Sequence, residues 1–225
     1  YSTLNKMEKP DINIVTIEDP IEFDLENINQ AQVNTKSGVT FASALRSILR
    51  QDPDIIMVGE IRDDETVELA IRAALTGHLV FSTIHTNDAA SGFARLLNWE
   101  IEPFLIASTV KGILAQRLVR RICENCKIEH EITDRESTLL KIDKKKYSKT
   151  FTGKGCMSCR NSGYRGRVGL YELLKVDEKV SQLVLNQEPS FKIKEMARNN
   201  GMMTMLEDGL QKALEDATSN ITKAN

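Results

Sequence analysis

Four cysteines stand in two pairs of identical spacing. Cys123 and Cys126 form one Cys-x-x-Cys pair, Cys156 and Cys159 form the other, and residues 127–155 lie between them. Each pair can present two thiolates to one metal, and four thiolates complete the tetrahedral shell of Zn²⁺ at about 2.3 Å. Because the first residues contain no apolar segment typical of a signal peptide, structural zinc is favoured over disulfides or reduced free thiols.

A second chemical feature is an apolar segment that ends in a carboxylate, Asp54-Ile-Ile-Met-Val-Gly-Glu60. Such a strand is typical of the Walker B element, whose acid holds Mg²⁺ directly or through water, or accepts a proton from the attacking water. A buried strand whose terminal acid merely caps a helix produces the same pattern. Both interpretations stay open on this segment alone.

Another apolar segment ends in Glu18-Asp19, with Glu22 one turn later. Two acidic strand ends in one sheet repel each other unless a cation or a basic group lies between them, which favours a metal site. His78 and His85 flank a third apolar segment, and strand geometry places them at opposite ends of it. Either can donate a hydrogen bond to phosphate; a histidine satisfied inside the fold is the alternative for each.

Three arginines are candidates for contact with phosphate. Arg46 and Arg50 are four residues apart and therefore share a helix face, while Arg62 follows the carboxylate at position 60 closely. Guanidinium groups suit phosphate or an acid on a neighbouring subunit, and a solvated surface position is the alternative. The phosphate-binding loop Gly-x-x-x-x-Gly-Lys-[Ser/Thr] does not occur, since Gly-Lys is present only at Gly153-Lys154.

Strands must position these groups. Runs rich in β-branched residues predict buried parallel strands over 12–17, 55–58 and 79–84. Between them, apolar residues at helical spacing predict one helix that begins near Phe41, and a second that is opened by Asp63 and Asp64 and stopped by Gly77. The alternation predicts an α/β fold with a mostly parallel sheet, whose ligands bind at the carboxyl ends of the strands.

Composition narrows the class of protein. Among 225 residues, 30 Lys and Arg against 32 Asp and Glu give a net charge of −2, which excludes a wholly basic nucleic-acid-binding protein. No apolar run approaches the roughly 20 residues that span a bilayer. Residues 1–100 carry 16 acidic and 8 basic side chains, whereas residues 111–167 carry 6 acidic and 15 basic ones. This shift indicates a change of structural unit or of facing surface.

Three segments together resemble the ATPases that power type II secretion and type IV pilus assembly in bacteria. Residues 16–22 (Thr-Ile-Glu-Asp-Pro-Ile-Glu) resemble the Asp box of that family, residues 45–63 its Walker B region, and residues 76–86 its His box. The resemblance extends over essentially the whole chain. The four-cysteine module favours the assembly and secretion members, because the pilus-retraction ATPases lack it.

The resemblance implies roles for the candidate residues. Glu60 would activate the attacking water, and Glu18, the other catalytic candidate, would help to organise Mg²⁺ and that water. Asp19 and Glu22 would help to organise Mg²⁺. The remaining nucleotide-binding candidates implied by the resemblance are His78, His85, Arg46, Arg50 and Arg62.

The resemblance also implies an organisation. It comprises a RecA-like ATPase domain over 1–121, a zinc-binding module over 122–168 and a helical segment over 169–225. ATP, Mg²⁺ and Zn²⁺ are the implied cofactors, and the phosphate loop is expected just upstream of Tyr1. The implied assembly is a homo-hexamer. The implied partner is a platform protein of the bacterial inner membrane, and the implied location is the cytoplasmic side of that membrane. No direct contact with nucleic acid is expected.

Two other functions stay open at this stage. One is a catalytically inert zinc-binding assembly fragment, because the chain lacks a phosphate loop. The other is a zinc-ribbon nucleic-acid binder, which the basic stretch 111–167 favours and its few aromatic residues disfavour.

Overall fold

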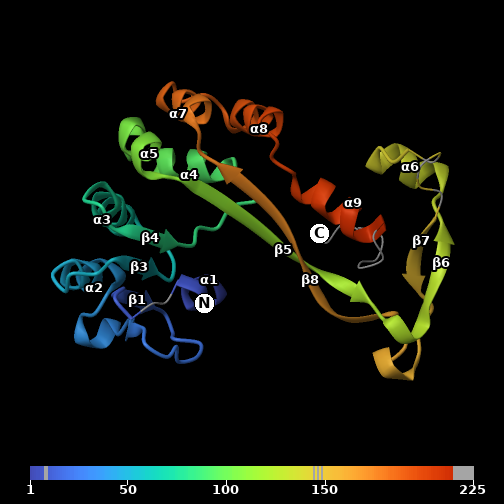
Figure 1. The fold of residues 1–225 in the computed structure, drawn as a ribbon, viewed down its shortest axis with the longest axis horizontal. Helices are drawn as coiled ribbons and strands as arrows, with labels where there is room; N and C mark the ends of the chain where they lie inside the picture. Colours follow the sequence, from blue (N-terminus) through green and yellow to red (C-terminus); the bar gives the residue numbers. More distant parts are fainter. Residues whose placement is uncertain (8–9, 144, 146, 148, 215–225) are drawn as a thin grey trace. The chain divides into compact units, whose positions relative to one another are not determined.

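The computed structural model describes residues 1–7, 10–143, 145, 147 and 149–214 (Figure 1). The chain forms two compact units. The first contains residues 1–111 and 176–196, and the second contains residues 112–175 with those from 197 onward. No helix of the described residues is both long and apolar enough to cross a bilayer.

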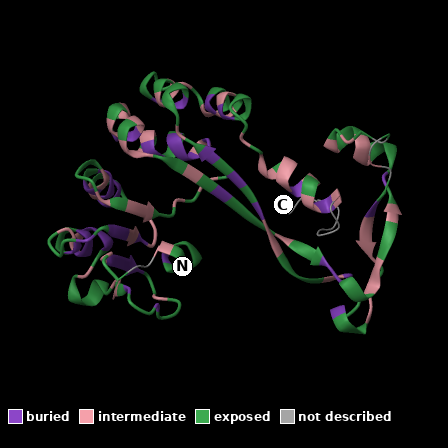
Figure 2. Cartoon of the chain, in the orientation of Figure 1, coloured by how far each residue is buried: buried purple, intermediate pink, exposed green. Residues whose placement is uncertain are grey.

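The first unit is built on a parallel four-stranded sheet. Its strands are β1 (Ile14–Glu18), β2 (Asn29–Gln32), β3 (Ile55–Val58) and β4 (Leu79–Ser82), in the order β2-β1-β3-β4. Every neighbouring pair is parallel, which confirms the α/β fold with a parallel sheet. The buried residues gather in β1 and β3, the two central strands (Figure 2).

Helices cover both faces of this sheet. On one face, Leu4 of α1 (Ser2–Met7) packs in a cluster with Ile14 and Ile55. Because side chains alternate along a strand, Ile17 and Ile56 point to the opposite face. There α2 (Phe41–Ile48) and α3 (Asp64–Leu75) contact the strands.

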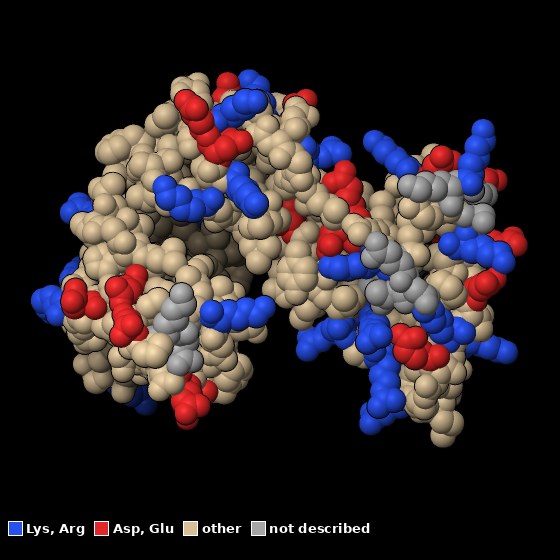
Figure 3. Space-filling model, in the orientation of Figure 1, with Lys and Arg blue, Asp and Glu red and all other residues tan. Residues whose placement is uncertain are grey.

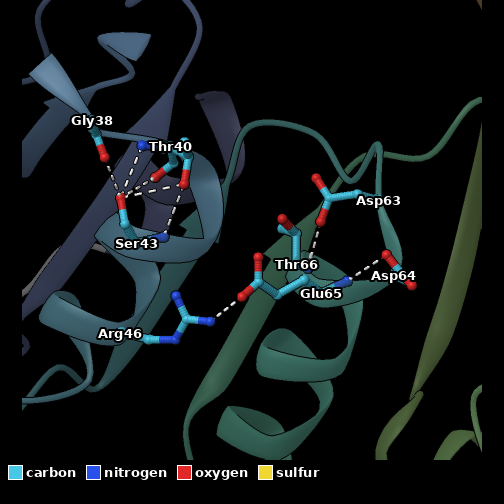
Figure 4. Close-up of polar contacts among 8 residues, drawn as sticks. All are labelled: Gly38, Thr40, Ser43, Arg46, Asp63, Asp64, Glu65 and Thr66. Atoms are coloured by element: carbon cyan, nitrogen blue, oxygen red, sulfur yellow. Dashed lines mark hydrogen bonds and ion pairs between the residues drawn. The ribbon is translucent and has the colours of Figure 1, made fainter. Parts of the chain in front are cut away.

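Both of these helices begin at side-chain caps (Figure 4). Thr40 and Ser43 form a reciprocal capping box at α2, and the carboxylate of Asp63 accepts the backbone N–H of Thr66 at 2.7 Å at α3. Gly77 follows α3 with a φ of +107°, a backbone conformation that residues other than glycine rarely adopt. The second helix therefore begins and ends where the sequence predicts.

More helices complete the first unit. They are α4 (Ser91–Asn98), α5 (Pro103–Thr109), α7 (Glu178–Leu185) and the first part of α8 (Ser190–Asn199). Helices α5 and α7 pack on each other, and Ile106 and Val180 are fully buried. The Lys194 ammonium group lies 2.7 Å from the carboxylate of Asp88, which ties α8 to the loop before α4.

The second unit is built from antiparallel strands. The long strands β5 (Gly112–Ile122) and β8 (Tyr164–Lys175) pair with each other, as do the shorter β6 (Lys127–Glu131) and β7 (Lys149–Gly153). Helix α6 (Asp134–Leu140) connects β6 to β7, and α9 (Met205–Leu214) contacts β8. Lys and Arg are abundant on the visible surface of this unit (Figure 3).

These units divide the chain differently from the three expected parts. Because β5 and β8 pair along almost their full length, residues 112–121 and 169–175 belong to the same unit as the cysteines. The three-part division of the whole protein stays a prediction.

Candidate nucleotide site and cysteine cluster

Acidic side chains gather at the carboxyl edge of the parallel sheet. Val58 pairs with Ile17, and the backbone N–H of Gly59 donates to the carbonyl of Ile17 at 2.8 Å. This register sets the end of β3 beside the end of β1. The structure thus brings four of the candidate residues around one cavity of about 380 Å³; they are Glu18, Asp19, Glu22 and Glu60.

Glycine at position 59 suits the close approach of these two strands. A Cβ atom there would lie 3.1 Å from the carbonyl oxygen of Ile17 and 3.3 Å from the Cα of Glu18. Both atoms belong to the backbone and cannot move aside cheaply. The small residue therefore lets the carboxylate of Glu60 emerge directly beside the end of β1.

Glu60 is held as a carboxylate by its basic neighbours. Its side chain is 19% exposed; Arg62 Nη2 lies 2.5 Å from Oε1, and the His85 ring lies 3.8 Å from Oε2. The hydrogen bond from Arg62 lowers the pKa of Glu60, and this effect outweighs the opposing effect of burial. Arg62 also reaches Asp19, at 3.5 Å, so that it bridges the two strand ends.

Glu18 differs from Glu60 because it is almost fully buried. Only 4% of the residue is exposed, and Tyr1, Thr16 and Gln30 all donate hydrogen bonds to its carboxylate. Sequence reasoning found Glu18 but missed these three donors. The alternation of a strand places Thr16 on the same face as Glu18 and was the available signal for one of them.

Two candidate residues lie away from this edge. His78 precedes β4, and its Nδ1 lies 2.9 Å from the carbonyl oxygen of Ala73, at the end of the sheet opposite Glu60. Arg50 lies near the amino end of β3, next to Gln51, whose carbonyl oxygen accepts from the Asn13 side chain before β1. The structure does not bring these two side chains to the acidic cavity.

Arg46 lies between two helices. Its guanidinium group pairs with Glu65 and so links α2 to α3 (Figure 4). Both side chains are about half exposed, at 48% and 56%, so this contact contributes little to stability.

The four cysteines form one cluster in the second unit. All four sulfur atoms lie within 4.8 Å of one another, and no disulfide joins any two of these cysteines. The Cys123–Cys156 and Cys126–Cys159 sulfur distances are both 3.8 Å. A tetrahedron with metal–sulfur bonds of about 2.3 Å has an edge of about 3.8 Å, so these residues fit Zn²⁺.

Backbone donors surround the cluster. The N–H groups of Gly155 and Gly163 point at the sulfurs of Cys126 and Cys159, each at 3.3 Å. Burial raises the pKa of Cys126 to about 12. For Cys159 burial acts in the same direction, but hydrogen bonds from the backbone and the neighbouring thiols lower the pKa to about 6.

Comparison with known proteins identifies the family. The family model described as type II/IV secretion system protein matches residues 1–224. The chain belongs to this family. One similar protein is the type IV pilus assembly ATPase PilB of Thermus thermophilus. The two are 48% identical over an aligned region that covers 97% of this chain and 25% of the length of PilB. Another is the type II secretion system protein E of Pseudomonas aeruginosa, 46% identical over 97% of this chain and 43% of its own length.

Solved structures agree with the fold. The pilus retraction motor PilT with bound ADP superposes with a TM-score of 0.69 at 29% identity, over 97% of this chain and 53% of that chain. The ATPase DotB of Legionella pneumophila gives 0.66 at 25% identity. The chain thus spans a quarter to less than a half of the length of the curated relatives just named.

Proposed function

We propose that the whole protein that contains these residues is an ATP-hydrolysing motor subunit which powers type IV pilus assembly or type II secretion. The family supports this proposal, because its members include ATPases of both systems. The observation that carries it in this chain is the joint placement of Glu18, Asp19, Glu22 and Glu60 around one cavity at the carboxyl edge of a parallel sheet.

The proposed chemistry uses this arrangement directly. Glu60 is ionised and lies beside the cavity, so it can accept a proton from a water that attacks a phosphoryl group. Asp19 and Glu22 supply the hard carboxylate oxygens that Mg²⁺ prefers. Mg²⁺, when bound with ATP, neutralises the charge that develops on the phosphates. Arg62 and His85, both next to Glu60, are the basic groups that can face phosphate at this edge.

Binding of the triphosphate needs a cradle of backbone N–H groups, and no segment of the sequence has the pattern of such a loop. We therefore propose that other residues of the whole protein supply the cradle and that these 225 residues alone turn over little ATP. Strand β4 is the last strand of the sheet, and Leu79 on it is 40% exposed. That edge can accept a further strand.

The other proposed features follow from the same family. We propose a homo-hexamer, with arginines of one subunit near the nucleotide of the next, and a RecA-like fold for the complete nucleotide-binding domain. Zn²⁺ would be held by Cys123, Cys126, Cys156 and Cys159, where it would join the two thiol-bearing turns. A platform protein on the cytoplasmic side of the inner membrane is the proposed partner.

ATP turnover by the full-length protein tests the proposal. We expect Glu60→Gln to lower kcat by about a hundred-fold or more, because the amide cannot accept a proton. Glu68→Gln is the matched control; this residue lies on α3, pairs with Arg72 and does not line the cavity. Full turnover by Glu60→Gln would remove the assigned role, and no hydrolysis by the unaltered full-length protein would reject the motor.

A further inference from the structure

The carboxylate of Glu18 receives hydrogen bonds from three side chains. Thr16 Oγ1 donates to Oε1 at 2.5 Å, Gln30 Nε2 donates to the same oxygen at 2.9 Å, and the phenol of Tyr1 donates to Oε2. A carboxylate offers about four lone-pair positions, so these donors leave about one. Glu18 is thus fixed in one orientation before any ligand arrives.

Sheet geometry explains why these residues meet. Thr16 and Glu18 are two residues apart on β1, so their side chains point to the same face. Gln30 pairs with Thr16 in the β1–β2 register, which places it next to them. Helix α1 packs on this face of the sheet, and the residue just before it, Tyr1, packs against the same cluster.

The phenol of Tyr1 also contacts the turn that carries Glu22. Its oxygen accepts the backbone N–H of Glu22 at 3.2 Å, and its ring packs edge to face on Phe23 with centroids 4.4 Å apart. Burial and the bond to Glu18 raise the pKa of Tyr1, so the phenol stays a donor at neutral pH. One hydroxyl therefore connects the buried acid of β1 with the acid on the following loop.

We propose that Tyr1 is a positioning residue that holds Glu18 and Glu22 in the arrangement needed for metal-bound nucleotide, with Thr16 and Gln30 as its supports. This inference rests on the proposed function and adds residues to the same site. About one lone-pair position of Glu18 stays available among the described residues, so this carboxylate could offer one oxygen to Mg²⁺, or to a water of its shell, when the metal is bound. Tyr1 acts through Glu18 and Glu22.

The test measures how much Mg²⁺ increases the affinity of the full-length protein for a fluorescent ATP analogue; this increase is the Mg²⁺-dependent gain. Tyr1→Phe removes the hydroxyl and keeps the ring against Phe23. We expect this variant to lower the Mg²⁺-dependent gain about ten-fold, the size of one hydrogen bond to a charged group, and to leave affinity without Mg²⁺ unchanged. Tyr164→Phe, the same deletion in the second unit, is the control and is expected to keep the full gain.

A double-mutant cycle separates positioning from general stability. In a Glu18→Gln background, Tyr1→Phe is expected to lower the gain less than it does in the unaltered protein, because the part of its effect that passes through Glu18 is already lost. An unchanged gain in Tyr1→Phe, or an equal loss in both backgrounds, overturns the inference. If the unaltered protein hydrolyses ATP and Glu60→Gln does not, the motor proposal survives that result.

Discussion

Among its neighbours, Arg62 lowers the pKa of Glu60 the most. Arg62 donates to its carboxylate and is the largest cause of its lowered pKa. A lowered pKa keeps a general base ionised at more acidic pH. The acid limb of the pH–rate profile therefore lies at a lower pH than it would without the arginine. The interaction with Arg62 therefore extends toward more acidic pH the range over which Glu60 can accept a proton.

We predict that Arg62→Gln raises the pKa of Glu60 toward the ordinary glutamate range. NMR titration of labelled glutamate carboxyls in the 225-residue chain without nucleotide measures this directly. In the full-length protein the acid limb of kcat is expected to move to higher pH. Arg72→Gln, which removes an arginine paired with Glu68 on α3, is expected to leave the pKa of Glu60 unchanged. An unshifted Glu60 in Arg62→Gln would assign the effect to His85.

Single residues were predictable where the chain itself marks them. Glu18 and Glu60 each end an apolar run, so their position at the carboxyl edge follows from the sequence. Gln30 was not predictable, because its contact with Glu18 depends on the register of β1 against β2. Arg50 and His78 lie in the motif segments 45–63 and 76–86, yet their places near the amino ends of β3 and β4 keep them away from the cavity.

At the scale of elements, the cap of α3 connects stability with the site. Asp63 caps this helix through the N–H of Thr66, and it stands three residues after Glu60. The same short turn therefore carries the proposed base, the arginine that controls it and the start of the helix.

We predict that Asp63→Ala lowers the free energy of unfolding by about 1 kcal/mol, the usual cost of losing an N-cap. Urea unfolding of the 225-residue chain, followed by circular dichroism, measures the change. Asp11→Ala, which alters an exposed aspartate before β1, is expected to shift stability by less than about 0.5 kcal/mol. Equal stability of Asp63→Ala and the unaltered chain would show that the turn holds α3 without its cap.

Elements with strong patterns were predicted and those with weak patterns were not. The sequence predicts β1, β3, β4, α2 and α3, since each has an apolar run or an apolar stripe at helical spacing. Strand β2 was missed because Asn29–Gln32 is polar, which the edge of a sheet tolerates. The β5–β8 pairing joins segments far apart in sequence, and no local signal marks such a partner.

At the scale of the whole molecule, the chain leaves the first unit at residue 112 and returns at residue 176. The charge shift near residue 110 located the departure, because the basic stretch begins there. The basic stretch ends at residue 167, whereas the chain returns to the first unit at residue 176, because the return is fixed by the end of β8 beside the start of β5. The cysteine cluster lies wholly within the second unit, so its loss is expected to act on that unit first.

We predict that the purified chain holds about one zinc ion and that Cys159→Ser releases it. Metal analysis by mass spectrometry measures the content, and hydrogen exchange locates the consequence. Amides of β6 and β7 are expected to lose protection, because Gly155, just after β7, donates to the Cys126 sulfur and the Cys126 turn precedes β6. Amides of β1 and β3 in the first unit are expected to keep theirs.

Met157→Ala is the matched control for this prediction. Met157 lies in the same turn, between two of the cysteines, and is 89% exposed, so its truncation leaves all four sulfurs in place. This variant is expected to keep its zinc and its exchange pattern. A zinc-free unaltered chain whose β6 and β7 amides are already protected would show that the thiols pack without a metal. Loss of protection in β1 and β3 of Cys159→Ser would show that the two units unfold together.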